Sequence, residues 1–283
     1  MDDRANKFPI AWQPLTPGGA AAFAGASFQR LFLFQLLVAL LAAATVVWLI
    51  CQTWFPVIER AINRLPAQSE IRYGKLAWPD ESPIRLAENT FLAISVDLSQ
   101  TGATRSLGHF QLEFTRTSLR IFSLFGFYQY PYPRDYRIAF SRPELQPWWG
   151  AWSPVMAAGC GVAMIIFLLL TWFLLATLYT VPVWLLGFFA NRALTLQGSW
   201  QLSCGALMAG GIFLTTAILF YSFAILDLVQ LTIAWPIHIL IGWFYAIAGL
   251  FSLPRHPQAP PLKGNPFTPK SADKQLETPQ RKD

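Results

Sequence analysis

Four long runs of apolar residues divide the chain, and a polar stretch with a different periodicity separates the first run from the second. The runs are Leu31–Trp54, Val155–Tyr179, Trp200–Leu226 and Ile233–Leu253. A bilayer core about 30 Å thick requires roughly 20 apolar residues in helical form. Each run satisfies that length, so the pattern predicts an α-helical membrane protein with about four spans.

The second run continues past Pro182 as far as Ala190, which is too long for one straight span. A proline inside a helix removes a backbone donor and favours a break. We therefore expect the second span to end near Tyr179, followed by an extra interfacial or re-entrant segment through Phe189.

The first run is predicted to be an uncleaved anchor. It begins about thirty residues into the chain, it is longer than the apolar region of a signal peptide, and no small-x-small cleavage site follows it. Cys51 would suggest a lipoprotein, but Ile50 stands where lipidation requires a small residue.

The polar stretch after the anchor starts with a helical period and then changes to a period of two. Val57–Leu65 places its apolar residues on one helical face and its charged residues on the other, which predicts an amphipathic helix. Leu92–Leu98, Phe110–Phe114 and Tyr136–Phe140 instead alternate apolar and polar residues, as strands with one buried and one solvated face do. Ile71 and Tyr73 suggest a further strand.

Ser99–Gly102 is typical of a turn between the two clearest strands. Residues 67–143 are therefore predicted to form a small, mainly antiparallel β module of about five strands. The alternation predicts that Ile94→Asp destabilises this module, because it buries an unpaired charge. Ser95→Asp is expected to be tolerated on the solvated face.

These elements predict five parts in the chain. They are a flexible cytoplasmic segment (1–30), a transmembrane anchor (31–54), an inserted extracytoplasmic part with the amphipathic helix and β module (55–151), a transmembrane bundle (152–254), and a disordered cytoplasmic tail (255–283). The two ends are rich in proline, glycine and polar residues, and such segments bury too little apolar surface to offset their ordering entropy.

Charge distribution then assigns an orientation. Between Pro143 and Pro254 the only charged residues are Glu144, Arg192 and Asp227. Short cytoplasmic loops carry an excess of Lys and Arg. With four spans the N-terminal segment, the Arg192 loop and the C-terminal tail share one side, and all three are basic. We therefore predict that both termini are cytoplasmic and that Arg192 is a topology anchor, with a ligand-binding charge as the alternative.

Little in the sequence indicates catalysis or a cofactor. Only 13% of the 283 residues are charged, and no basic patch with interleaved aromatics suggests nucleic-acid binding. The three cysteines and three histidines match no metal-ligand spacing. There is no nucleophile elbow and no phosphate-binding loop. We therefore predict no catalytic, cofactor-binding or metal-binding residues.

A few polar residues leave alternatives open. Asp80 and Glu81 are expected to face water in a loop, and Asp97 is expected to point outward from its strand without a partner. Asp227 at a span end and His238 inside the fourth span are expected to be structural, with proton transfer as the alternative. Two small-xxx-small pairs, Ala157/Gly161 and Ala206/Gly210, predict close helix packing.

The stretch Phe125–Pro133, FGFYQYPYP, is unusually aromatic. Its aromatic residues could line a groove for a ligand or partner, rest on lipid headgroups, or fill the core of the module. As candidate partner contacts we single out five residues: Phe125, Phe127, Tyr128, Tyr130 and Tyr132.

The layout resembles an uncharacterised bacterial inner-membrane family that combines an N-terminal anchor, an exported β module and a multi-span bundle distantly like the Yip membrane proteins. The resemblance rests on PAQSEIRYGKLAWPDESP (Pro66–Pro83), LAISVDLSQTG (Leu92–Gly102) and FTRTSLRI (Phe114–Ile121). It implies a multi-pass protein of the cell inner membrane and carries no known activity.

Three functions remain open. The first is a non-enzymatic scaffold, assembly or recognition component that contacts the lipid bilayer and a membrane or envelope protein through its β module. The second is a transporter or channel component, which requires a polar path between the spans. The third is an envelope enzyme, which requires converging acids or a nucleophile on the β module.

Overall fold

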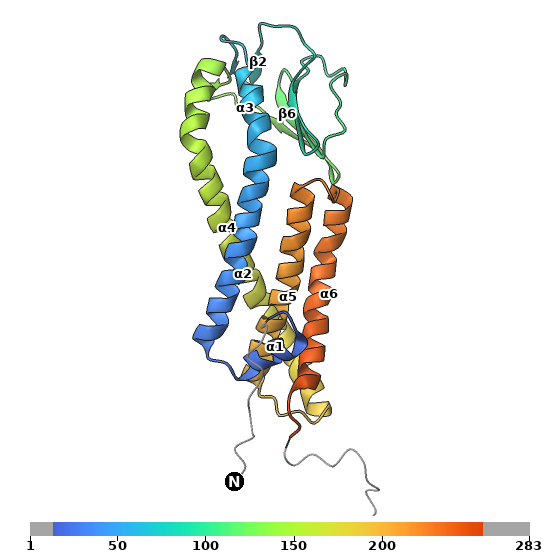
Figure 1. The fold of residues 1–283 in the computed structure, drawn as a ribbon. Helices are drawn as coiled ribbons and strands as arrows, with labels where there is room; N and C mark the ends of the chain where they lie inside the picture. The colour runs from blue at the N-terminus through green and yellow to red at the C-terminus, as the bar shows by residue number, and fades with distance from the viewer. Residues whose placement is uncertain (1–13, 257–283) are drawn as a thin grey trace, which may run out of the picture.

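The computed structural model describes residues 14–256, which form a helical bundle with a β module at one end (Figure 1). All strands of the module lie between Glu70 and Ala139. Within the described residues, four helices are long and apolar enough to cross a membrane. The predicted combination of about four apolar helices and a small sheet domain is therefore confirmed.

The helices occupy both flanks of the module in the chain. Before it lie α1 (Pro17–Ala21), a 3-10 turn (Ala22–Gly25), α2 (Phe28–Leu49), a π-turn (Ile50–Trp54) and α3 (Phe55–Asn63). After it lie α4 (Arg142–Phe189), α5 (Leu196–Ser222) and α6 (Leu228–Ser252).

The predicted anchor and amphipathic helix form one continuous rod. The π-turn joins α2 to α3 without a break, so the chain passes directly from the apolar bundle into the module. Val57, Ala61 and Ile62 of α3 are buried. Glu59 and Arg60 are exposed on the other face, which confirms the predicted amphipathic pattern.

The predicted break at Pro182 is wrong, because α4 runs without interruption from Arg142 to Phe189 and contains no re-entrant segment. Proline fits the helical φ angle and costs one backbone hydrogen bond. On either side of Pro182 the helix buries Tyr179 and Val183 in the bundle core. Continuous burial along this face keeps the helix intact.

Close helix contacts in the bundle depend on small residues. A Cβ atom on Gly210 of α5 would lie 2.2 Å from the backbone oxygen of His238 in α6. A Cβ on Gly161 of α4 would lie 3.2 Å from Val47 Cγ2 in α2. Both predicted glycine-containing pairs therefore lie where two helices approach, and Gly210 lets the α5 and α6 backbones touch.

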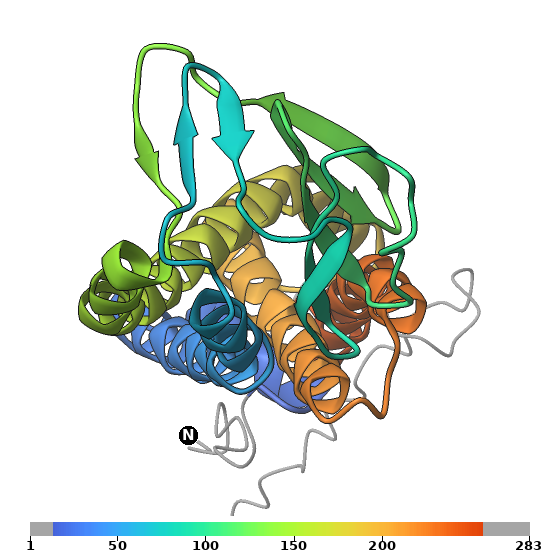
Figure 2. The same ribbon diagram turned by 90° about the horizontal axis from the view of Figure 1, so that it is seen from above.

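The module contains two sheets that lie side by side over the bundle (Figure 2). The smaller has the order β2-β1-β8, and the larger has the order β3-β4-β5-β6-β7. The strands are β1 (Glu70–Arg72), β2 (Lys75–Ala77), β3 (Ile84–Glu88), β4 (Leu92–Val96), β5 (Phe110–Phe114), β6 (Ser118–Ser123), β7 (Gly126–Pro131) and β8 (Ile138–Ala139).

The predicted hairpin between the two clearest strands is wrong. β4 and β5 pair in parallel, whereas every other strand pair is antiparallel. Parallel neighbours require a crossover connection instead of a tight turn. The segment 97–109 supplies that crossover, and Ser99–Gly102 is only its first bend.

The N-terminal segment is also more ordered than the composition predicts. Pro17–Gly25 is helical and packs against α5 and α6, with Ala20 and Phe23 fully buried. It closes the end of the bundle opposite the β module, beside the Arg192 loop and the end of α6 (Figure 1). The predicted disordered tail lies almost wholly outside the described residues.

We expect Gly210→Ala to destabilise the bundle, because the added methyl group would overlap the His238 carbonyl and force α5 and α6 apart. A cost of about 1–3 kcal/mol is typical of such overpacking. Thermal unfolding of the full chain in detergent micelles measures it. Gly159→Ala in α4 is the matched control, since nothing lies within 4 Å of its added Cβ. Equal unfolding temperatures for both variants would contradict the close contact.

Candidate functional site

The aromatic stretch forms the free edge of the larger sheet. β7 pairs with β6 on one side only, and every residue of Gly126–Pro131 is exposed. An edge strand presents a row of unpaired backbone N–H and C=O groups that can template a further strand. β7 contains no charged residue and no bulge, both of which block edge pairing in other proteins, and its one proline, Pro131, is the last residue of the strand.

The five candidate aromatics occupy different environments. Phe127, Tyr128 and Tyr130 lie along β7 and are more than half exposed. Tyr132 instead fills the core of the module, where its hydroxyl donates to the Thr115 carbonyl oxygen (3.1 Å). Burial raises the pKa of Tyr132. Tyr132 is therefore structural, and the exposed candidate surface comprises the other four residues.

Phe125 lies at the β6–β7 turn and is 71% exposed. Its neighbours Ser123 and Leu124 line a cavity of about 370 Å³ together with Asp227 and Val229 at the start of α6. The turn therefore reaches the end of the helical bundle at the start of α6. The stretch thus combines a bundle-facing tip with an outward edge.

The face of the sheet that was predicted to be solvated is buried. Ser95 of β4, Gln111 and Glu113 of β5, and Thr115 just after β5 are at most 2% exposed, whereas Phe110, Leu112 and Phe114 are only half-buried. The crossover segment 97–109 covers the polar face and removes it from water. Ser95→Asp is therefore expected to destabilise the module, which corrects the prediction from strand alternation.

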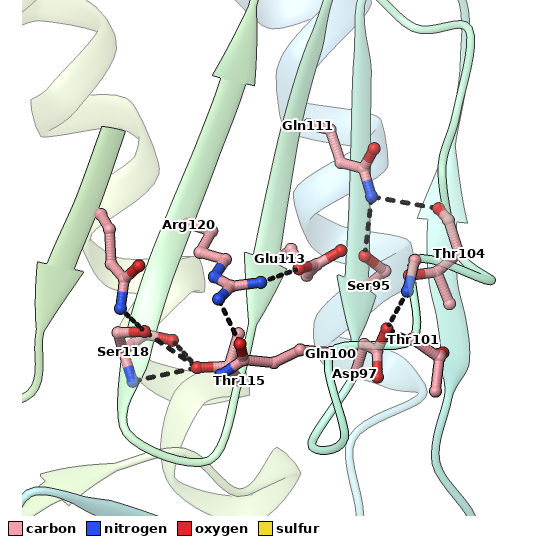
Figure 3. Close-up of polar contacts among 12 residues, drawn as sticks. Ser95, Asp97, Gln100, Thr101, Thr104, Gln111, Glu113, Thr115, Ser118 and Arg120 are labelled. Atoms are coloured by element: carbon pink, nitrogen blue, oxygen red, sulfur yellow. Dashed lines mark hydrogen bonds and ion pairs between the residues drawn. The ribbon is translucent and has the colours of Figure 1, made fainter. Parts of the chain in front are cut away.

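Hydrogen bonds satisfy most of this polar face (Figure 3). Gln111 Nε2 donates to Ser95 Oγ (3.2 Å) and to the Thr104 carbonyl (3.0 Å), and its Oε1 accepts from the Ser106 N–H (3.1 Å). Gln129 donates to Ser118 Oγ (3.0 Å). The strands and the crossover are therefore joined by specific polar contacts.

Asp97, predicted to be unpartnered, anchors the crossover. Its Oδ2 accepts from the Thr101 hydroxyl (3.1 Å) and the Gly102 N–H (2.9 Å). Burial raises the pKa of Asp97, but these hydrogen bonds to Gly102 and Thr101 outweigh burial and hold the pKa below its ordinary value. Asp97 is therefore a charged cap for the first bend of the crossover.

Glu113 is a buried charge whose carboxylate is only partly hydrogen-bonded. Arg120 Nη1 lies 3.6 Å from Glu113 Oε1, whereas Oε2 has no hydrogen-bond partner. Burial and the nearby negative charge of Asp97 raise the pKa of Glu113, although Arg105 and Arg120 oppose that rise. The two acids converge beneath the crossover and outside any cleft, which suits a structural role better than acid–base chemistry.

A second contact fixes the module on the bundle. His109 Nδ1 lies 2.8 Å from the Tyr221 hydroxyl at the end of α5, and the two rings are stacked. Phe91 meets the same Tyr221 ring edge-on at 5.1 Å between centroids. Neither His109 nor Tyr221 was singled out in the sequence, because the two residues lie 112 positions apart and no local pattern links them.

Arg192 lies at the opposite end of the bundle and has specific partners. Its Nη1 donates to the Leu253 carbonyl (2.6 Å) at the end of α6, and its guanidinium lies 5.7 Å from the Phe251 ring centroid. The adjacent Ala193 N–H donates to the Pro254 carbonyl (3.0 Å). A cation at a helix C-terminus is favoured by the helix dipole, so Arg192 also caps α6.

The remaining candidates are structural where the chain is described. Asp227 forms a capping box with Gln230 at the start of α6, and His238 Nδ1 contacts the Trp235 carbonyl. Asp80 and Glu81 are exposed in a loop, as predicted. Between residues 14 and 256 no group of three or more His, Cys, Asp or Glu side chains could hold a metal ion.

No protein-family model, no curated protein and no solved structure matches this chain. The resemblance to an inner-membrane family therefore stays a prediction, and the class that the structure itself defines is a four-helix apolar bundle with a β module at one end.

We expect Glu113→Gln to raise the stability of the folded chain at pH 7, because it replaces a desolvated carboxylate, opposed by the negative charge of Asp97, with a neutral amide. The raised pKa means that the wild-type penalty is absent below the unfolded value of about 4.5 and grows as pH rises through the folded pKa. The advantage of Gln should therefore vanish near pH 4, as measured by thermal unfolding in uncharged micelles.

Glu113→Ala is the comparison, since it leaves Arg120 beside a cavity without a carboxylate and should cost roughly 2 kcal/mol. A Gln variant that is as unstable as the Ala variant at pH 7 would show that the charge itself stabilises the module.

Proposed function

We propose that this protein is a non-enzymatic membrane component that recognises another membrane or envelope protein and serves as a scaffold for its assembly. The observation that carries the proposal is the uncharged, aromatic, free edge of β7. Its expected occupant is an extended segment of the partner that adds a strand beside β7, with backbone hydrogen bonds for affinity and side-chain contacts for specificity.

The proposed partner segment has a defined chemistry. Along β7, Tyr128 and Tyr130 project to one face and Phe127 and Gln129 to the other. An extended peptide with apolar residues at alternate positions would complement the tyrosines, because aromatic and β-branched residues pair favourably across neighbouring strands. Arg120 lies close to the second face, with its guanidinium 5.7 Å from the Phe127 ring centroid, and would favour a polar or acidic residue there.

In the proposed orientation the module is extracytoplasmic, both termini are cytoplasmic, and the protein is a multi-pass component of the cell inner membrane. The arrangement of the chain supports this orientation. The start of the described N-terminal segment, Arg192 and the end of α6 lie at one end of the bundle, and the module lies at the other (Figure 1). The described basic residues of the short segments, Arg30, Arg192 and Arg255, thus lie at the end of the bundle away from the module, as expected for cytoplasmic loops.

A transporter has less support. Several hydroxyl groups of the bundle donate to a carbonyl of their own helix: Thr177, Thr215, Thr216 and Ser222. Hydroxyl groups bonded within their own helices add little to a polar path, and the cavity of about 200 Å³ that Thr215 lines with Thr171 and His238 is mainly apolar. An enzyme has less support as well, because the converging acids Asp97 and Glu113 are covered by the crossover.

The recognition proposal is tested with a photoactivatable phenylalanine analogue at Tyr128 or Tyr130 of the full chain in native membranes. We expect a discrete protein adduct from each position. Tyr130→Lys should lower the adduct yield from position 128 roughly tenfold, equivalent to about 1.4 kcal/mol of binding free energy.

The matched control places the same analogue at Tyr136, which is equally exposed but lies outside β7. Adducts only with lipid from positions 128 and 130, or the same protein bands from position 136, would refute recognition by β7.

Orientation is tested by cysteine labelling in a chain whose three native cysteines are replaced by alanine. Asp80→Cys in the exposed module loop should react with a membrane-impermeant thiol reagent in intact cells. Gln197→Cys, exposed at the opposite end of the bundle, should react only after permeabilisation. The reverse pattern would place the module in the cytoplasm.

A further inference from the structure

An apolar cavity of about 280 Å³ lies between α3, the first part of α4 and the larger sheet. Among its walls are Ile58 of α3, Leu65 just after α3, Leu112 and Phe114 of β5, and Leu145 and Met156 of α4. All the side chains that line it are apolar, with two tryptophans as the most polar among them. The cavity is nearly twice the volume of an engineered apolar cavity of about 150 Å³ that binds benzene.

The burial pattern of β5 is the reverse of what the polarity of its side chains predicts. The polar residue Glu113 is 1% exposed, while its apolar neighbours Leu112 and Phe114 remain half-buried and line the cavity. Apolar side chains normally take the most buried positions. The apolar face of β5 is thus less buried than its polar face.

We infer that the cavity binds one hydrocarbon chain of a bilayer phospholipid. Water is a poor occupant, because a buried water needs two to four polar partners and these walls offer almost none. A hydrocarbon chain in the cavity would remove the apolar walls from water, which is favourable in proportion to the apolar area covered.

The dimensions fit one chain. Leu145 and Met156 lie eleven residues apart on α4, and a helix rises 1.5 Å per residue, so the cavity wall extends about 16 Å along the helix axis. A hydrocarbon core about 30 Å thick gives each leaflet chains about 15 Å long. The wall is therefore about as long as one acyl chain.

The position of the cavity explains how a lipid chain reaches it. Trp148 and Trp149 line it, and Trp152 and Val155 are exposed on the next turn of α4. Tryptophan concentrates at the headgroup level of a bilayer. Met156 then lies at the membrane end of the wall and Leu145 at the module end, so a chain enters from the outer surface of the bilayer.

A bound chain would complete the contact between α3, α4 and the sheet, so the lipid would stabilise the module on its two helical supports. This inference depends on insertion of the bundle in a bilayer. It does not depend on recognition by β7, because β7 lies at the free edge of the sheet, away from the cavity. A failure of β7 cross-linking would leave the lipid site intact.

The test uses the full chain in vesicles of phosphatidylethanolamine and phosphatidylglycerol that contain a phosphatidylcholine with a diazirine near the end of one acyl chain. After illumination, adducts are mapped by mass spectrometry. We expect adducts within Ile58–Leu65 and Leu145–Met156, in addition to adducts on the outward residues Phe167 and Phe173 of the same helix α4.

Ala61→Phe introduces a bulky ring from the cavity wall and should lower the adducts in both segments roughly tenfold, while adducts at Phe167 and Phe173 stay unchanged. Ala77→Phe on the exposed face of β2 is the matched control and should leave both sets unchanged. If Ala61→Phe does not fold, Met156→Trp fills the cavity from α4.

Three results would overturn the inference. The first is wild-type labelling confined to the outward face of the helices. The second is labelling of the cavity segments that is unaffected by both filling variants. The third is labelling of the cavity segments that a co-purifying peptide competes away and unlabelled phospholipid does not. That result would assign the cavity to a protein segment. A parallel arm with a free photoactivatable fatty acid distinguishes a bilayer lipid from a soluble chain, and stronger labelling by the free acid would also count against the proposal.

Discussion

The attachment of the β module to unbroken helices governs the rest of this structure. A domain with eight short strands has little core of its own, and small cores are marginally stable in isolation. Here the π-turn carries α2 directly into α3, and α4 enters the bundle without interruption. The module therefore borrows two helical faces for its core, and the Tyr221 contact with His109 and Phe91 adds a third support from α5. Together these supports determine which edge of the sheet stays free and which face meets the helices.

The sheet distributes polarity in an unusual way as a result. Its polar face lies beneath the crossover, where side chains of the strands bond to the crossover, and two carboxylates and an arginine belong to the same layer. Such a layer contributes little net stability, because desolvation offsets most of its attraction, but it disfavours alternative registers that would leave charges unpaired. The apolar face meets α3 and α4 across a gap. The parallel pairing of β4 and β5 thus gives the sheet two different faces. The polar face is hydrogen-bonded to the crossover, and the apolar face lines the cavity.

The sequence predicted the long helices and the clearest strands because their periodicities are local. The helix at Val57, the strand Phe110–Phe114 and the close helix contact at Gly210 all appear in the structure where the pattern places them. Errors arose where a distant segment decides the outcome. Alternation shows that Ser95 and Ile94 face opposite ways, but only the course of 97–109 decides that both are buried. Pro182 carries a local signal for a break, and packing of its neighbours Tyr179 and Val183 against the bundle overrides it. The His109–Tyr221 contact has no local signature at all. The prediction of Arg192 as a topology anchor remains untested, and its hydrogen bond to the Leu253 carbonyl, 61 residues later, has no local signature either.

The π-turn at Ile50–Trp54 has a geometric consequence of its own. Each residue of an α-helix advances the side-chain direction by about 100°, so one residue more or fewer in this turn would rotate everything beyond it by about that angle. Below the turn, Leu31, Val38 and Ala42 face the bundle, and above it Val57 and Ala61 face the sheet. The turn thus fixes the rotation of the module about the axis of α2. A single-residue deletion there would move the edge of β7 around the bundle and leave every strand internally unchanged. The number of residues in this turn therefore determines the rotation of the module about α2. That number can change only together with a matching change in how α4 enters the bundle.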